Sequence, residues 1–383
     1  MAKLESRRYQ GGDEYGIVKL YNKITGRCRT VEQHRWEWLN TPQGVGSIWV
    51  ITESGTGEIV GHHGLIPMQL DYFGKTLLLG KTENTILHPK YLGTGIYFIH
   101  EKKFLQQAVK KFDLLYTTFA QGTPAKIRRK IGYKTAGQYL TYIKATKNTY
   151  LKKLMDSLIE RKISNIKLKI FCKGIGHIFS YPLMIFFLRY GKIDKNITFE
   201  VVEDIDAIDS EIDRFWDCNK GEFGITINRT SKYLKWRIFK NPNVKYKFLL
   251  ARKLGKIVGY VITKISTTDI NRCEIVDLVC EQSNEIIFNT ILNAAIKRLI
   301  EANVYVVSFT TLDSNKFLNR CLSKNGFLPI QNIAAFVRKY LTSHISGEQS
   351  VLLVKVINKS INGKKIYNPA YWYYTDLFNE GIS

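Results

Sequence analysis

The chain has 383 residues, 45% of them apolar, so it can bury a sizeable core, and its length favours two or three domains. Its many aromatic residues and only eight prolines exclude a disordered or low-complexity chain. The formal net charge of +24, from 57 basic and 33 acidic residues, favours anionic partners such as phosphates, an anionic membrane or RNA. A lysine-rich genome would produce the same imbalance.

The cysteines and the N-terminal residues indicate the compartment. No C-x-x-C pair occurs, and no histidine lies at zinc-ligand spacing from a cysteine, so we expect reduced thiols and no metal site. Residues 1–8 carry charge where a signal peptide needs an apolar run. We therefore expect a cytoplasmic protein.

Apolar patterns of period two and period 3.6 alternate along residues 5–143. In chain order they predict strands, one amphipathic helix and one basic helix. The expected strands are residues 47–52, 59–67, 77–87, 114–119 and 135–143, and the expected helices are residues 95–112 and 124–130.

Residues 144–197 differ in composition from the rest and are expected to form a basic helical connector. Residues 144–192 hold eleven Lys or Arg against two acids. The uncharged run from Gly174 to Leu188 contains Pro182 and is shorter than the roughly 20 residues that span a bilayer. Two interpretations remain: a connector that packs its apolar stripe on the two flanking domains, which we favour, or a basic amphipathic segment lying on an anionic membrane.

The second half repeats the order of elements found in the first. Its expected strands are residues 247–252, 257–266, 274–280 and 304–310, and its expected helices are residues 284–301 and 314–324. Strands followed by a helix, a strand and another helix predict a mixed sheet with helices on its faces. The fold class is therefore α/β.

Matched landmarks indicate an internal duplication. Trp38 precedes Gly61 by 23 residues, and Trp236 precedes Gly259 by the same 23. Further along, residues 130–133 (Lys-Ile-Gly-Tyr) match residues 324–327 (Lys-Asn-Gly-Phe). These spacings predict two copies of one unit, with domains at 1–143 and 198–383 and the connector at 144–197 between them.

A glycine-containing loop in the first half is the most informative local sequence. A predicted strand ends near residue 88, and Leu92-Gly93-Thr94-Gly95-Ile96-Tyr97 then leads directly into a helix. Glycines let backbone amides approach a ligand closely, and the first turn of a helix adds further unpaired N–H groups. The pattern suits a pyrophosphate, although an ordinary strand-to-helix turn gives the same sequence.

At this loop the chain resembles the GCN5-related N-acetyltransferases, whose fourth strand splays at a bulge and delivers a Gly-rich loop to the pyrophosphate of acetyl-coenzyme A. The family pattern is Arg or Gln, two residues, Gly, one residue, then Gly or Ala; residues 92–97 occupy these places, with Leu92 and Tyr97 departing from it. The resemblance implies acetyl-CoA or another acyl-CoA as cofactor, held by backbone amides with Lys90 or Lys102 as a substitute charge. It extends to both halves, as GNAT-like units, and the tandem arrangement is similar to acyltransferases associated with surface-polysaccharide biosynthesis.

The matching loop of the second half has no glycine and carries two carboxylates, within residues 281–285 (Glu-Gln-Ser-Asn-Glu). Like charges would repel phosphates there. We expect this half not to bind coenzyme A, and to have a structural role or to wall the acceptor pocket.

The resemblance also implies roles for residues around the splayed strand. The oxyanion donor would be the backbone N–H of Ile86 or Leu87, and the catalytic base would be Glu83, for which the alternative is a strand glutamate paired with a neighbouring lysine or with solvent. Gln121 would contact the pantetheine arm. Arg128 occupies the place of the family's tyrosine and would stabilise a thiolate, but it cannot act as a proton donor.

His62 and His63 are neighbours on a predicted strand, so they must point to opposite faces. One of them, together with Trp38, is expected to contact the acceptor, and the alternative is that all three have structural roles. No metal is expected.

These observations predict a CoA-dependent N-acyltransferase that acts on the amine of an amino sugar linked to a nucleotide or lipid diphosphate. The expected partner is an anionic amine acceptor, and a membrane surface contacted through residues 144–192 is the second interpretation of the connector; nucleic acid is not expected. Two alternatives remain: an aminoacyl-tRNA-dependent transferase that builds peptidoglycan bridges, and a non-catalytic basic module that binds a membrane or nucleic acid.

Overall fold

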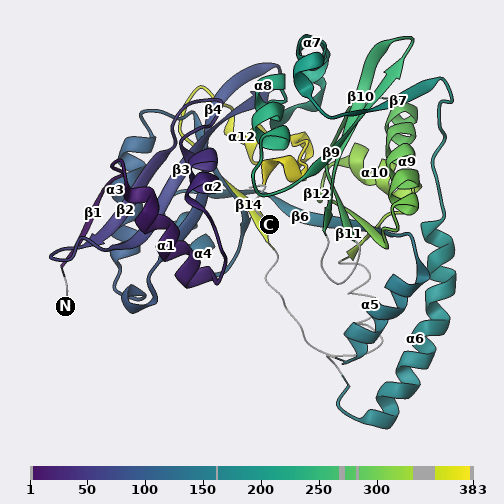
Figure 1. Cartoon of the computed structure of the whole chain (residues 1–383), viewed down its shortest axis with the longest axis horizontal. Helices are drawn as coiled ribbons and strands as arrows, with labels where there is room; N and C mark the ends of the chain where they lie inside the picture. Colours follow the sequence, from purple (N-terminus) through teal and green to yellow (C-terminus); the bar gives the residue numbers. More distant parts are fainter. Residues whose placement is uncertain (1–2, 161–162, 267–271, 282–283, 331–349, 380–383) are drawn as a thin grey trace.

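A computed structural model describes residues 3–160, 163–266, 272–281, 284–330 and 350–379 (Figure 1). The strands and helices expected from the sequence are all present, with ends shifted by a few residues. The first half contains β1 (Leu4–Arg8), α1 (Asp13–Thr25), α2 (Val31–Trp38), β2 (Ser47–Glu53), β3 (Ile59–Tyr72), β4 (Lys75–Leu87), α3 (Ile96–Ala108), β5 (Leu114–Ala120), α4 (Gly122–Lys130) and β6 (Lys134–Ala145).

Two helices, α5 (Asn148–Glu160) and α6 (Ile166–Phe187), lead to the second half. Its elements are β7 (Ile197–Val202), α7 (Asp209–Asn219), β8 (Ile225–Ile227), α8 (Ser231–Leu234), η4 (Lys235–Phe239), β9 (Tyr246–Lys253), β10 (Lys256–Ser266), β11 (Arg272–Cys280), α9 (Glu285–Glu301), β12 (Val306–Leu312), α10 (Lys316–Lys324), β13 (Leu328–Pro329), β14 (Val351–Val356), α12 (Gly363–Ile366), η5 (Pro369–Tyr371) and η6 (Asp376–Phe378).

The strands join into one mixed sheet that runs through both halves. Its order is β1-β2-β3-β4-β5-β14-β6-β12-β11-β10-β9-β7, with β8 beside β3 and β13 beside β6. The strand that closes the first half, β14, comes from the C-terminal part of the chain and lies between β5 and β6. In turn, β6 pairs with β12 of the second half along seven residue pairs. Each half therefore completes its sheet with a strand from the other part of the chain.

The two faces of the first half's sheet pack differently. Under α3 and α4 lies a small separate core, built from residues such as Trp49, Leu65, Phe104 and Leu115. The opposite face, which includes Trp38, contributes to a large core that continues into the second half. The helical spacing of apolar residues in α3 produces the first core, because Phe104, Leu105 and Ala108 fall on one side of the helix.

The connector forms a helical hairpin of α5 and α6 that projects from the body (Figure 1). Its base is anchored to the body: Phe187 packs with Ile143 and Val306, and buried Lys144 donates hydrogen bonds to the carbonyl oxygens of Phe187 and Asn325. Burial lowers the pKa of Lys144 to about 8. The hairpin thus starts from a fixed point on the sheet.

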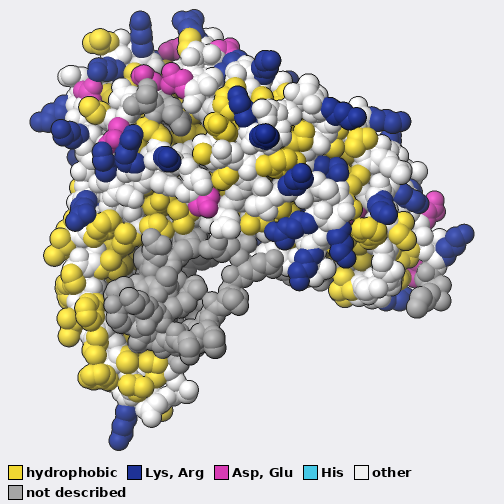
Figure 2. All heavy atoms as spheres, turned by 180° about the vertical axis from the view of Figure 1, so that it is seen from behind, with side chains coloured by type: hydrophobic (Ala, Val, Ile, Leu, Met, Phe, Trp, Pro, Cys, Tyr) yellow, Lys and Arg dark blue, Asp and Glu magenta, His cyan; other side chains and the backbone are white. Residues whose placement is uncertain are grey.

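Most of α6 is exposed, which differs from the packed apolar stripe that we favoured. Ile178 and Ile185 are each about 70% exposed, and hydrophobic side chains gather along the outer edge of the hairpin (Figure 2). Among the helices that the structure describes, α6 alone has the length and composition of a membrane-crossing helix. Residues 161–162, between the two helices, lie outside the described part of the chain.

Candidate active site

A gap opens in the sheet between β4 and β5. The two strands pair in parallel at only three positions, from Leu79 with Leu114 to Lys81 with Tyr116. Beyond Lys81 they diverge, and β4 also shifts its register against β3, because Gly64 lies opposite Glu83 whereas His62 lies opposite Ile86. This irregularity is a bulge, which bends a strand away from its neighbour. The splayed strand expected from the sequence is therefore present.

The glycine loop lies at the open end of this gap. Gly93 and Gly95 adopt left-handed backbone conformations, with φ of 82° and 77°, and Gly95 caps the start of α3. A Cβ atom on either glycine would meet nothing within 4 Å. Among the described residues, the backbone amides of Gly93, Thr94, Gly95 and Tyr97 have no hydrogen-bond acceptor. The turn is open and can offer several N–H groups to an anion.

The strand after the bulge presents one particular amide to the gap. The amide of His88 donates to the carbonyl of Val60 on β3 at 2.7 Å. Because amides alternate in direction along a strand, the N–H of Leu87 must point away from β3, toward the gap. Of the two predicted oxyanion donors, Ile86 and Leu87, the geometry favours Leu87.

Glu83 lies on the sheet face opposite to α3. Its carboxylate forms an ion pair with Lys81, at 2.8 Å, and both side chains are buried. Burial lowers the pKa of Lys81. Tyr116, the residue beside Lys81 on β5, faces the same side, where its hydroxyl donates to the carbonyl of Phe378. Glu83 thus has the lysine partner that was the alternative to a catalytic role.

A second polar cluster lies on the α3 side of the gap. Arg128, on α4, donates to the hydroxyl of Thr85 on β4 at 3.0 Å, and the hydroxyl of Tyr97 donates to Glu101 on α3. The Nε2 atom of His63 lies 3.5 Å from Glu101. Burial raises the pKa of Glu101 and, with help from Arg128, lowers the pKa of His63 well below its usual value. Arg128 therefore places a positive charge beside the gap.

The sequence reasoning did not identify Glu101. It is a buried carboxylate on a helix whose exposed side carries lysines, and it follows Tyr97 by four residues, one helical turn. That spacing was visible in the sequence and would have suggested the pair.

The other predicted site residues are distributed as follows. His62 and His63 face opposite sides of the sheet, as alternation predicts: His62 packs edge-on against Trp38, with ring centres 5.1 Å apart, and His63 packs against Phe104. All three predicted acceptor contacts are buried, and none lines a described pocket. Their contact with an acceptor stays a prediction.

The indole ring of Trp38 occupies the space that a side chain at residue 64 would fill. A Cβ atom on Gly64 would lie 2.3 Å from its ring.

Gln121 stands at the first turn of α4, is exposed, and accepts a weak hydrogen bond from Ser350 at 3.4 Å. It lies directly after the diverging end of β5, beside the gap.

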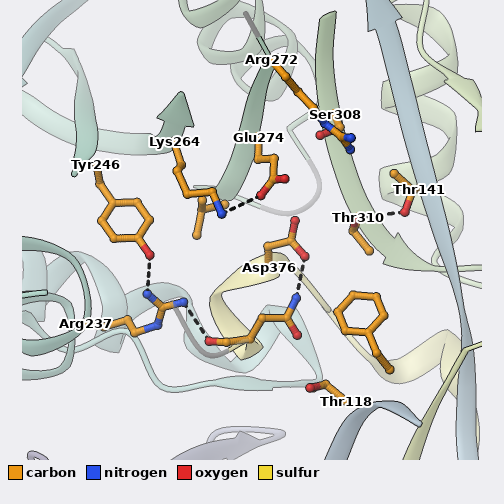
Figure 3. Close-up of a pocket in the computed structure, with 13 residues that line it drawn as sticks. Thr118, Thr141, Arg237, Tyr246, Lys264, Arg272, Glu274, Ser308, Thr310 and Asp376 are labelled. Carbon is orange, nitrogen blue, oxygen red and sulfur yellow. Dashed lines mark hydrogen bonds and ion pairs between the residues drawn. The ribbon is translucent and has the colours of Figure 1, made fainter. Parts of the chain in front are cut away.

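A pocket of about 420 Å³ lies where the two halves meet (Figure 3). It is bordered by the end of β5, by β6, and by β10, β11 and β12. Its lining residues are Thr118, Phe119, Thr141, Arg237, Tyr246, Lys264, Arg272, Glu274, Val276, Ser308, Thr310, Asp376 and Asn379.

Charged groups dominate the wall of this pocket. Lys264 pairs with Glu274 at 3.0 Å, and Arg237 donates to the hydroxyl of Tyr246 at 2.7 Å. Asp376 accepts a hydrogen bond from the side chain of Asn379 at 2.8 Å (Figure 3). Burial, and then the negative charge of Glu274, raise the pKa of Asp376 to about 7. Sequence reasoning missed this pocket because its residues come from distant parts of the chain.

The second half also has diverging strands, but a segment of the chain bridges them. β11 and β12 pair from Arg272 with Val306 to Ile275 with Phe309 and then separate. Beyond that point, the hydroxyl of Tyr373 donates to the carbonyl of Leu278 on β11. After β12, the side chain of Asn315 donates to the carbonyl of Trp372 at 2.9 Å.

A buried ion pair lies beside this bridge. Arg229 contacts Asp277 of β11 through two hydrogen bonds, and Thr375 donates to the same carboxylate. Of the loop that matches the glycine turn, Gln282 and Ser283 lie outside the described residues, and Glu285 pairs with Lys324 at 2.7 Å. The expectation that this half binds no coenzyme A stays a prediction, and the bridging segment supports it.

Solved structures share this fold. The sequence matches no protein-family model and no functionally curated protein. A conserved protein of Enterococcus faecalis, described as a probable N-acyltransferase, superposes with a TM-score of 0.60 at 14% identity, over 94% of this chain and 73% of its own. GCN5-related N-acetyltransferases of Anabaena variabilis and Kribbella flavida give TM-scores of 0.55 and 0.54 at 12% and 10% identity, each over 93% of this chain and over 73% and 72% of their own. The chain therefore has the α/β fold of the GCN5-related N-acetyltransferases.

Proposed function

We propose that the chain is a coenzyme A-dependent N-acyltransferase whose first half holds the acyl-CoA. The observation that carries this proposal is the open turn at residues 93–97, which lies at the end of the gap between β4 and β5. Its amides at Gly93, Thr94, Gly95 and Tyr97 lack acceptors among the described residues. The named activities of the fold neighbours agree with it.

The residues around the gap fit an acyl-CoA. The amides of residues 93–97 would hold the diphosphate, and Lys102, exposed on the first turns of α3, adds positive charge nearby. Lys90 contributes less, because it lies 3.5 Å from the carboxylate of Glu53. Gln121 would contact the pantetheine arm. When bound, the thioester supplies an activated acyl carbonyl for attack by an amine.

The chain's own groups then have separate tasks. The N–H of Leu87 points toward the gap and would stabilise the oxyanion, which is the largest single contribution in many acyl transfers. Arg128, fixed by its hydrogen bond to Thr85, would stabilise the negative charge of the leaving sulfur without giving up a proton.

We also propose that the chain is a duplicated unit with divided tasks, in which residues 1–143 bind the cofactor and residues 198–383 do not. Trp36 and Trp236 support this: their rings stack at 5.0 Å, and each indole N–H donates to the other's carbonyl at 3.1 Å. Such reciprocal contacts form when equivalent residues face each other across a two-fold axis. In the proposed duplication Trp36 is thus the counterpart of Trp236, whereas the sequence landmarks matched Trp38 with Trp236.

The exposed hairpin suggests where the enzyme works. We propose that α6 lies on an anionic membrane and so brings the site to a lipid-linked acceptor. Its apolar side chains are exposed, whereas Lys167, Lys169 and Lys173 stand near its N-terminus. The uncharged run from Gly174 to Leu188 is shorter than the roughly 20 residues that span a bilayer, which favours a helix on the surface over one that crosses it. Each lysine near anionic lipid contributes about 1 kcal/mol.

Flotation with vesicles tests the membrane proposal. The protein should float with phosphatidylglycerol vesicles and stay behind with phosphatidylcholine, and Ile178→Asp with Ile185→Asp should abolish flotation. Flotation that the double variant retains, or a hairpin that instead buries its apolar face in a dimer seen by light scattering, would contradict the proposal.

Calorimetry with acetyl-CoA tests the central proposal. The wild type should bind, and Gly95→Trp should weaken binding at least tenfold by filling the turn. Gly255→Trp is the matched control, because Gly255 also has a left-handed φ, of 76°, with nothing within 4 Å of its Cβ position, but lies in the second half. No binding by the wild type at millimolar acetyl-CoA would refute the proposal.

A further inference from the structure

We infer that the pocket between the two halves binds the acceptor, that this acceptor is a polyhydroxylated amine with an anionic group, and that Asp376 accepts its proton. The inference rests on the proposed acyl transfer and adds the substrate class and the proton acceptor. It is carried by the position and the lining of the pocket (Figure 3).

The pocket adjoins the gap through β5. Thr118 and Phe119, at the diverging end of this strand, line the pocket, and Phe119 departs from strand geometry with a left-handed φ of 47°. Thr118 shares a strand face with Tyr116, which lies beside Lys81 and so on the side of Glu83. The glycine turn belongs to the other face of the sheet, the face that α3 covers. An acyl group reaching through the gap would therefore emerge toward the pocket.

Two cations of the pocket lack a carboxylate partner among the described residues. Arg237 is 3% exposed, and its guanidinium donates to the hydroxyl of Tyr246 and to the carbonyl of Asn379. Arg272 is exposed. By contrast, Lys264 is neutralised by Glu274. A buried arginine without a carboxylate is suited to an anion on the ligand, such as a phosphate or carboxylate.

The rest of the lining suits a sugar. Thr118, Thr141, Ser308 and Thr310 bring hydroxyl groups from three strands. Thr141 and Thr310 are bonded to each other at 3.2 Å and Ser308 donates to the carbonyl of Cys273 at 3.4 Å, and the hydroxyl oxygens can still accept hydrogen bonds from a sugar. Phe119 is 42% exposed and stacks on Tyr139 with ring centres 4.3 Å apart, which fixes an aromatic face at the pocket. The volume of about 420 Å³ is within the range of small-molecule sites. An amino sugar phosphate combines these features.

Asp376 is placed to take the proton from the amine. It is half-buried, is oriented by Asn379, and lies on the pocket wall, with Glu274, Lys264 and Arg237 as its charged neighbours and Tyr374 behind it. A general base works best when its pKa is near the working pH, and the pKa of Asp376 is raised to about 7.

The bond changes balance with this assignment. Transfer forms the N–C bond, breaks the C–S bond and releases the sulfur as a thiolate, while the proton of the attacking nitrogen passes to the carboxylate of Asp376 and then to solvent. Glu83, the base expected from the family resemblance, is held in the buried ion pair with Lys81 and does not line the pocket. The two carboxylates are therefore rival candidates that mutation can separate.

The test measures CoA release with glucosamine, galactosamine and their 1-phosphates as acceptors, together with acetyl-CoA binding by calorimetry. Asp376→Asn should lower kcat at least 100-fold and remove the rise of rate near pH 7, with acetyl-CoA binding unchanged. Glu83→Gln, the matched carboxylate control, should lower kcat far less. Arg237→Gln should raise KM at least tenfold for the 1-phosphates and leave KM for the neutral amino sugars almost unchanged.

Three results would overturn the inference: a larger loss of kcat in Glu83→Gln than in Asp376→Asn, an equal effect of Arg237→Gln on charged and neutral acceptors, or no transfer to any of the four acceptors by a wild type that binds acetyl-CoA. If the wild type does not bind acetyl-CoA, the proposed function itself has failed. The two failures are thus distinguished by the calorimetric arm.

Discussion

Replacing Arg229 by methionine tests whether the buried ion pair beside the diverging strands of the second half stabilises the fold or belongs to a ligand site. The guanidinium contacts Asp277 through Nε and Nη2 at 2.8 and 3.0 Å, and both side chains are fully buried. Arg229→Met leaves the carboxylate buried, with the hydroxyls of Tyr260 and Thr375 as its remaining side-chain donors among the described residues. Breaking one side of a buried pair costs about 3–5 kcal/mol.

This loss in the free energy of unfolding lowers the melting temperature by a measurable amount. An unfolding entropy of roughly 2 cal/mol/K per residue gives about 0.8 kcal/mol/K for 383 residues, so a loss of about 4 kcal/mol lowers Tm by about 5 °C. The double variant Arg229→Met with Asp277→Leu removes both charges and should recover most of this loss, because well-packed apolar residues replace buried pairs at little cost.

Thermal and guanidinium unfolding followed by circular dichroism would measure these values, with acetyl-CoA calorimetry on the same samples. Affinity for acetyl-CoA should be the same in the wild type and in both variants, since the first half holds it. The reasoning is refuted if Arg229→Met loses under 1 kcal/mol, or if the double variant is no more stable than the single one. A fall in affinity with the fold intact would mean that the second half helps to hold the cofactor.

Three further predictions concern stability. Gly64→Ala places its Cβ 2.3 Å from the ring of Trp38 and should cost about 1–3 kcal/mol in denaturant unfolding, and a neutral result would mean that the ring can move aside. The carboxyl of Asp376 ionises near pH 4 in the unfolded chain and near pH 7 in the folded one, so the wild type loses stability as the pH rises between these values. Asp376→Asn should match the wild type at pH 4 and exceed its stability at pH 8 by up to about 4 kcal/mol, at about 1.4 kcal/mol per pKa unit, whereas equal differences at both pH values would contradict the assignment. A double-mutant cycle of Trp36→Ala and Trp236→Ala should give a coupling energy of about 0.5–3 kcal/mol in the same unfolding assay, and strict additivity would show that the stacked pair contributes nothing.

Local patterns predicted the elements and the glycine turn. Residues 77–87 and 114–119 alternate or run apolar as buried strands do, and the structure confirms strands there. The two glycines at 93 and 95 were identified because glycine lets backbone amides approach a ligand closely, and both have positive φ in the structure. The opposite orientations of His62 and His63 follow from the same local geometry.

Long-range placement could not be predicted in the same way. No strand was expected at β14, and its apolar run does not reveal that it lies between β5 and β6. The pocket at the junction depends on that placement, since Phe119 and Asp376 meet only after the sheet is assembled. The landmarks matched Trp38 with Trp236, whereas the ring that stacks on Trp236 is that of Trp36, because equal spacing to the next glycine does not show which tryptophan lies opposite. The sequence left the exposure of α6 open between two interpretations, because a helical apolar stripe looks the same whether a protein or a lipid covers it.

The exchanged strand has a consequence for synthesis. β14 begins at Val351, so the ribosome has made nearly the whole chain before the sheet of the first half can close. Until then β5 and β6 each expose an unpaired edge, which is the surface that favours aggregation of nascent chains. The cofactor-binding half therefore cannot mature ahead of the rest, and a truncated product that ends before Val351 would lack a finished site even though every residue of the glycine turn is present.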